Sequence, residues 1–376
     1  MRSTQYELLG GIDAARFLAL HWQKRLRLVR RAIDGFYGLI SRDALRRIAA
    51  RDDVESRLVI QTGNEWTLEH GPFPLRRYRS LPPTGWTLLV QGLNLVHPAA
   101  DLLLRRFNFI PYARLDDVMV SHAAPAGGVG PHFDSYDVFL LQGAGRRRWR
   151  TSAQRDLALR PDSPLKLLAR FQPSKEWILD PGDMLYLPPS IAHDGIAIDD
   201  CMTYSIGFRA PQATELAREF LAYLDQRLDL TGQYRDPDLR STRHPARIEA
   251  ALITRLAAMV ESIRWSRATI ADFAGCCLST PKQHVQFSAP SAPVTMRTFL
   301  TRARRVGVRL DAATLLLYQG AALFINGESV TVPAVARNVI RRLADQRELS
   351  GTDVIPEALS SLHAWYLAGL LHLGAS

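Results

Sequence analysis

Residues 127–150, GGVGPHFDSYDVFLLQGAGRRRWR, place a histidine and a carboxylate two positions apart, His132 and Asp134. Side chains two apart on a β-strand point to the same side, so His132, Asp134 and Tyr136 are expected to share one face. The apolar run VFLLQ that follows indicates that this strand enters an interior. A carboxylate is costly there unless it meets a cation. The pattern therefore predicts a metal site.

The third ligand is expected from the stretch PGDMLYLPPSIAHDGIAI, residues 181–198, in which His193 follows a double proline. His132, Asp134 and His193 then supply two imidazoles and one carboxylate. This set leaves three positions of the metal open, as in non-haem Fe(II) oxygenases. The alternative is a hydrogen-bonded core histidine beside a capping aspartate.

Oxygen activation at Fe(II) needs an electron source, commonly a 2-oxo acid whose distal carboxylate pairs with a fixed cation. In the stretch GRRRWRTS, strand alternation places Arg147 on the same face as Trp149, and Arg146, Arg148 and Arg150 on the opposite, solvated face. An inward guanidinium requires a buried anion, so Arg147 is the candidate for the co-substrate carboxylate. The alternative is that Arg147 pairs with a protein carboxylate. Ser121 is a further candidate contact.

The elements that position these residues are short. From about 86 to 210, brief apolar or alternating runs separated by proline and glycine predict an antiparallel sandwich or barrel. Helices are expected near 13–25, after Ser41, and two or three times between 211 and 275. In the last hundred residues, TLLLYQGAALFINGESVTVP has Asn-Gly between apolar runs, which predicts a hairpin. A helix, a hairpin wing and another helix resemble a winged helix.

Length and composition set the frame. A chain of 376 residues favours two or three domains, and its 47% hydrophobic content is ordinary for a soluble globular protein. No membrane span or secretory signal is evident. Three cysteines form neither a disulfide framework nor a zinc pattern, which favours the cytoplasm. The net charge of +10 favours an acidic partner such as nucleic acid, although an arginine-rich proteome would give the same charge.

Several stretches together resemble the bacterial ribosomal oxygenases of the JmjC type. They are LDDVMVS, GGVGPHFDSYDVFLLQGAGRRRWR, PGDMLYLPPSIAHDGIA, YSIGFRAP and the N-terminal GGIDAARFLALHWQKRLRLVRRA. The nearest branch hydroxylates an arginine of ribosomal protein number sixteen of the large subunit.

The resemblance implies an α+β chain with three parts. A double-stranded β-helix (cupin/JmjC) catalytic domain covers residues 1–210, a helical dimerisation region covers 211–275, and a winged-helix-like domain covers 276–376. It also implies Fe(II) at His132, Asp134 and His193, with 2-oxoglutarate held at Arg147 and O2 consumed. The expected reaction couples the conversion of 2-oxoglutarate to succinate with hydroxylation of an arginine β-carbon.

A substrate guanidinium needs acidic or aromatic partners. Asp116 and Asp117, at the start of a strand beside the metal loop, are candidates, although capping of the strand end would explain them equally well. Tyr136 would stack on the cation, and Ser205 is a weaker candidate.

Alternative functions remain open. The target could be a histidine of another ribosomal protein, or the chain could be a non-catalytic cupin and winged-helix regulator that binds nucleic acid. A homodimer is expected from the apolar stripe of Ile248, Leu252, Leu256 and Val260, unless this stripe packs on the same chain. Contact with ribosomal RNA, which is negatively charged, would explain the net positive charge of the chain.

Overall fold

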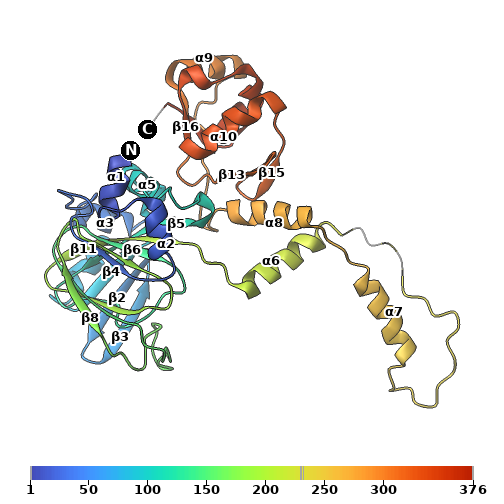
Figure 1. The fold of residues 1–376 in the computed structure, drawn as a ribbon, viewed down its shortest axis with the longest axis horizontal. Coiled ribbons are helices and arrows are strands. Elements are labelled where there is room, and N and C mark those ends of the chain that lie inside the picture. The colour runs from blue at the N-terminus through green and yellow to red at the C-terminus, as the bar shows by residue number, and fades with distance from the viewer. Residues whose placement is uncertain (1, 229–230, 232, 375–376) are drawn as a thin grey trace.

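The computed structural model describes residues 2–228, 231 and 233–374. The chain forms a β-barrel with helices packed on its outside, then a run of three helices, then a small C-terminal domain of helices and short strands (Figure 1). This mixed α and β architecture agrees with the class predicted from the sequence. The three domain boundaries predicted from the sequence stay predictions.

The larger sheet of the barrel has eight antiparallel strands in the order β1-β9-β6-β11-β5-β4-β2-β3. Most of them are the short apolar runs recognised in the sequence. Their bounds are Arg27–Val29, Met184–Leu187, Val138–Gln142, Cys201–Phe208, Leu115–Ala123, Trp86–Val90, Ser56–Thr62 and Glu65–His70.

The smaller sheet consists of β10 (Ala192–Ala197), β7 (Arg147–Ser152) and β8 (Lys175–Leu179), in that order. Trp149 and Leu179 of this sheet belong to one buried apolar cluster with Leu140 and Leu185 of the larger sheet. The two sheets therefore face each other, and their inward side chains fill the barrel.

The outer face of the larger sheet is covered by the N-terminal helices, which bury residues such as Phe17 and Leu45 against Phe139 and Tyr204. Two of these helices begin at capping residues, because the side chains of Asp13 and Ser41 accept backbone N–H bonds of the first turn. The helices are α1 (Arg2–Leu8), α2 (Ala14–Leu20), α3 (Arg42–Ile48), α4 (Leu93–Val96) and α5 (Pro98–Arg105).

The expectation that His132, Asp134 and Tyr136 lie on one strand is wrong, because β6 begins only at Val138. Residues 124–137 form a loop beside the smaller sheet. Ala126 and Gly127 exchange backbone bonds with Ala197 of β10, and His132 forms an isolated antiparallel bridge with His193. Gly128, Gly130 and Pro131 lie between these two contacts and interrupt continuous pairing, so the alternation in the sequence does not correspond to a strand there.

Three helices follow the barrel: α6 (Ala213–Asp225), α7 (Ala250–Glu261) and α8 (Arg267–Ser279). Helices α6 and α8 pack together through Phe220 and Phe273, whereas α7 points away from the barrel and has no buried residue (Figure 1). The alternative that the apolar stripe packs on the catalytic domain of the same chain is therefore wrong for α7.

The C-terminal domain has its own apolar core around Phe299, Ile340 and Leu362. The predicted Asn-Gly hairpin is present, with Asn326 and Gly327 at positive φ between β14 (Ala322–Ile325) and β15 (Glu328–Val330). The other elements are α9 (Met296–Val306), α10 (Arg337–Gln346), α11 (Leu359–Leu367), β12 (Val308–Leu310), β13 (Leu316–Gln319), β16 (Glu348–Leu349) and β17 (Leu371–Leu373).

Helix α8 joins this domain tightly, since a side chain at Gly275 would overlap the Phe324 ring. Within the described ranges, no helix combines the length and the apolar character that crossing a bilayer requires.

Candidate active site

The two histidines of the predicted metal site are joined through their backbones. The His132 N–H donates to the His193 carbonyl at 2.9 Å, and the His193 N–H donates to the His132 carbonyl at 2.8 Å. A pair that exchanges both bonds fixes the two residues opposite each other. The imidazole rings consequently lie close, with centroids 4.2 Å apart.

Each imidazole is oriented by a second contact with its own chain. Nδ1 of His132 is 2.8 Å from the Gly130 carbonyl, and Nδ1 of His193 is 2.9 Å from the Ile191 carbonyl. A carbonyl only accepts, so both Nδ1 atoms carry the proton and both Nε2 atoms keep a free lone pair. This is the arrangement by which proteins prepare histidines as metal ligands.

Asp134 completes the group, with an Oδ2 atom 3.7 Å from Nε2 of His193. The potential ligand atoms of His132, Asp134 and His193 all lie within 4.8 Å of one another. It is the one such group found among the described residues. Burial, and then neighbouring His132, lower the pKa of His193 to about 4, which favours the neutral imidazole that a metal requires. The residues present therefore fit a divalent ion with two nitrogen ligands and one oxygen ligand.

Arg147 and Trp149 are buried on β7, whereas Arg148 and Arg150 are partly exposed, so the predicted alternation is confirmed. Arg147 is 5% exposed, and its Nη1 atom donates to Ser121 Oγ on the opposite sheet at 3.3 Å. Its Nε and Nη2 atoms have no hydrogen-bond partner. No carboxylate of the described residues pairs with it, so the alternative of a protein partner is not supported.

A buried guanidinium with two free donors fits a small carboxylate ligand, because bidentate pairing would satisfy both donors. In the smaller sheet, Arg147 of β7 pairs with Ala197 of β10, and Thr151 of β7 pairs with His193 of β10. Arg147 and His193 are therefore separated by four residues along the strands. Four residues of a strand span roughly 13 Å, a gap that a long arginine side chain and a small dicarboxylate together can fill. Trp149 lies between the two positions, with its ring 5.7 Å from the Arg147 guanidinium carbon.

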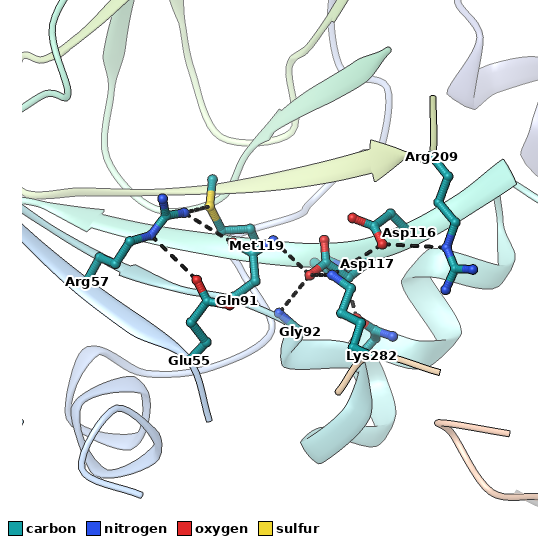
Figure 2. A network of polar contacts seen from close by, with 11 residues as sticks. Glu55, Arg57, Gln91, Gly92, Asp116, Asp117, Met119, Arg209 and Lys282 are labelled. Atoms are coloured by element: carbon teal, nitrogen blue, oxygen red, sulfur yellow. Dashed lines mark hydrogen bonds and ion pairs between the residues drawn. The ribbon is translucent and has the colours of Figure 1, made fainter. Parts of the chain in front are cut away.

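The two acidic candidates at the start of β5 are not free. Lys282 contacts both, with Nζ 2.9 Å from Asp117 Oδ2 and 3.2 Å from Asp116 Oδ1 (Figure 2). Asp117 Oδ2 also accepts from Gln91 Nε2 at 2.8 Å and from the Gly92 N–H at 3.0 Å. Sequence reasoning missed Lys282, which stands in a proline-flanked linker 165 positions from Asp117.

The other two substrate candidates are Tyr136 and Ser205. Tyr136 and Asp116 line a groove of about 720 Å³ that also includes Lys282 and faces helices α6 and α8. Burial, followed by the carboxylates of Asp134 and Asp117, raises the pKa of the Tyr136 hydroxyl above its usual range. Ser205 is buried on β11, two residues beyond Thr203 and therefore on the same face. That these residues bind substrate stays a prediction.

Three family profiles match the chain between residues 102 and 372. The JmjC domain matches residues 102–216, and the ROXA-like winged helix matches residues 262–372. The AraC-like ligand binding domain matches residues 173–260, overlapping the JmjC match.

Similar proteins extend the match to most of the chain. The Ribosomal protein uL16 3-hydroxylase of Escherichia coli is 36% identical over 323 residues, which cover 84% of this chain and 85% of that protein. A Probable ribosomal oxygenase of Haemophilus influenzae is 36% identical over 53% of this chain and 50% of its own length. The structure of the Escherichia coli ribosomal oxygenase YcfD with cobalt and 2-oxoglutarate superposes with a TM-score of 0.83, at 32% identity, covering 97% of this chain and 99% of that chain.

Proposed function

Because the chain belongs to the JmjC-type ribosomal oxygenases, we propose that it is an Fe(II)- and 2-oxoglutarate-dependent hydroxylase of a ribosomal protein, with an arginine of uL16 as its target. The observation that carries the proposal is the pairing of a metal-ligand group with an unsatisfied guanidinium inside one barrel. The similarity of the chain to a uL16 3-hydroxylase over 84% of its length supports the choice of target.

In this proposal His132, Asp134 and His193 hold the iron, and Arg147 and Ser121 hold the distal carboxylate of 2-oxoglutarate. When bound, the iron and 2-oxoglutarate supply oxygen activation: one atom of O2 enters succinate, CO2 leaves, and the other atom becomes the substrate hydroxyl. The protein itself orients the metal ligands and excludes water. The Gly130 and Ile191 carbonyls keep the two imidazoles turned toward one point, and Trp149 and the barrel core keep water away from the reaction.

The acidic character of the groove favours arginine over histidine as the target. Asp116, Asp117 and Asp134 all lie near the Tyr136 hydroxyl, so a cation beside that ring would meet several carboxylates. A neutral imidazole would gain no charge pairing from these carboxylates. The non-catalytic regulator is disfavoured because it assigns no role to the metal-ligand group or to the free donors of Arg147.

The test is turnover. The protein is incubated with Fe(II), 2-oxoglutarate and recombinant uL16, and both succinate and the mass of uL16 are measured. We expect succinate formation and one added oxygen atom on an arginine, with His132→Ala reducing both by at least about 100-fold because a metal ligand is lost. Equal succinate production by the two proteins, or oxygen on a histidine instead, would contradict the proposal.

A homodimer is the second part of the proposal. Of the predicted stripe, Ile248, Leu256 and Val260 are between 42% and 67% exposed on or beside α7, and Leu252 is partly buried. Ile253 and Met259 of α7 add to the exposed apolar surface. Such a stripe favours a partner helix, and a second copy of the same stripe would cover it symmetrically. Contact with ribosomal RNA also remains a prediction, for which the exposed Arg297, Arg302, Arg304 and Arg305 of α9 are the available basic face.

A further inference from the structure

Asp116 and Asp117, with the residues that contact them, form an acidic cluster at the start of β5. Lys282 belongs to this cluster although it follows helices α6, α7 and α8 in the sequence. It lies three residues beyond the end of α8, in the linker that leads into the C-terminal domain. Its ammonium group reaches the start of β5 in the catalytic domain, where it contacts Asp116 and Asp117 together (Figure 2). Lys282 is therefore a wall of the groove in which Tyr136 lies.

The contacts divide the carboxylate oxygens into two groups. Asp117 Oδ2 is saturated, since Lys282, Gln91 and the Gly92 N–H all donate to it. Among the described residues no donor reaches Asp117 Oδ1 or Asp116 Oδ2. Of these two residues only Asp116 lines the groove, since Asp117 is 2% exposed. Arg209 Nε lies 3.7 Å from Asp116 Oδ1, the oxygen that Lys282 also contacts. The chain thus occupies one oxygen of each carboxylate, and Oδ2 of Asp116 is the unoccupied oxygen of the residue that lines the groove.

The choice of lysine at this position is unusual for the chain. Only four of its 47 basic residues are lysines, at positions 24, 166, 175 and 282. An ammonium is a compact charge that can bond to one oxygen of each neighbour. A guanidinium presents a planar fork that pairs with both oxygens of one carboxylate. An arginine at position 282 would therefore compete for the oxygens that the structure leaves free.

We propose that Lys282 is a positioning residue that determines specificity for a cationic substrate: it binds one oxygen of Asp116 and one of Asp117, and leaves Oδ2 of Asp116, which lines the groove, for a substrate guanidinium. This inference rests on the proposed arginine hydroxylase function. It connects substrate recognition to the linker of the C-terminal domain, because the residue that prepares the acidic pair lies outside the barrel.

The electrostatics of the cluster agree with this role. Burial and the charge of Asp117 raise the pKa of Asp116, while Lys282 and Arg209 oppose that rise. Burial alone would lower the pKa of Lys282, but the two carboxylates raise it on balance, so the ammonium stays charged. Removing Lys282 would raise the pKa of Asp116 further. Asp116 would then lose its negative charge at a higher pH than in the wild type, so substrate binding would be more sensitive to a fall in pH.

The test compares Lys282→Met, Lys282→Arg and Lys175→Met, in which Lys175 is an exposed residue at the start of β8. For each full-length protein, kcat and KM for uL16 and KM for 2-oxoglutarate are measured between pH 6 and 8.5. For Lys282→Met we expect KM for uL16 to rise about tenfold at pH 7 and more at pH 6, because Asp116 is no longer held in place for its charge-assisted contact with the substrate. For Lys282→Arg we expect a similar rise at every pH. Values of kcat and KM for 2-oxoglutarate should stay within about twofold.

Circular dichroism and thermal unfolding show whether each variant is folded, and Lys282→Gln replaces Lys282→Met if that variant is not. The inference is overturned if Lys282→Arg equals the wild type, or if Lys282→Met leaves KM for uL16 unchanged while the wild type is active. A parallel loss of kcat and both KM values would also overturn it, since that pattern indicates a structural role. If the wild type does not hydroxylate an arginine of uL16, the proposed function fails, and the inference fails with it.

Discussion

Arg147 and His193 are both buried polar residues, yet their hydrogen bonds are satisfied to different degrees. His193 has its Nδ1 bound to a carbonyl, and only the lone pair of Nε2 remains. Arg147 keeps two donors without a partner in a site that is 5% exposed. Buried donors of this kind are rare in folded proteins because they cost free energy. The imbalance indicates that the barrel is completed by an anion that the chain does not supply.

Arg147→Met is the prediction that follows at this scale. We expect KM for 2-oxoglutarate to rise by about 10- to 100-fold, as for the loss of hydrogen bonds to a charged group. The ligand-free protein should be no less stable than the wild type in thermal unfolding, because a buried charge without a partner is removed. Arg148→Met is the matched control, since Arg148 is adjacent on β7 but partly exposed on the other face. Equal KM values for the two variants would contradict the assignment.

Single residues also show what the sequence could reveal. The inward position of Arg147 followed from strand alternation, which depends only on local geometry. The contact of Lys282 with Asp117 could not be found in that way, because it joins two segments that are far apart in the sequence. The available signal was the rarity of lysine in an arginine-rich chain, which indicates that a residue type was selected but does not name its partner.

At the scale of elements, the strands and helices were largely predictable, because short apolar runs, capping residues and an Asn-Gly turn carry their own signals. The loop that carries His132 was not. Its two backbone bonds to His193 resemble strand pairing at one position only, and a sequence pattern cannot distinguish a single bridge from a ladder. The prediction used that strand to place His132 and Asp134 on one face, whereas in the structure the pairing of His132 with His193 brings the ligands together.

The contact between Trp149 and Gly195 provides a test of how β7 and β10 shape the cavity. A methyl group at Gly195 would lie 2.6 Å from the Trp149 ring. We expect Gly195→Ala to lower the free energy of unfolding by about 1–3 kcal/mol, because the Trp149 ring must move. We also expect it to raise KM for 2-oxoglutarate, because this ring is 5.7 Å from the Arg147 guanidinium carbon.

Chemical denaturation and steady-state kinetics measure both effects. Gly207→Ala is the control, since a side chain at Gly207 would meet no atom closer than 3.8 Å. We expect its stability to stay within about 0.5 kcal/mol of the wild type. If Gly195→Ala were as stable as this control, the close packing of Trp149 would not be a constraint on the cavity.

At the scale of the whole molecule, the notable feature is a helix without a partner. Helix α7 extends from the body and exposes apolar residues that a water-soluble surface normally avoids (Figure 1). The 42.1 kDa chain should therefore sediment at about twice its own mass at micromolar concentration. Leu256→Asp together with Val260→Asp should give monomers, because two charges would enter the apolar contact.

Thr254→Asp is the control for this substitution, since position 254 lies on the other side of α7 and is also exposed. It should leave the dimer intact. A wild-type protein that sediments as a monomer, or a dimer that survives the double substitution, would contradict the proposal. The monomeric variant should keep its Tm for the barrel, because no residue of α7 is buried.

The bridge between His132 and His193 joins the glycine-rich loop to the edge of the smaller sheet by two backbone bonds. A metal ion bound by both imidazoles would hold the loop and the sheet together and would bind only the folded chain. The free energy of unfolding would therefore rise with the fraction of protein that has metal bound. Iron supply would then govern how long each molecule survives proteolysis in the cell as well as how fast it works, and starvation for the metal would deplete the protein itself.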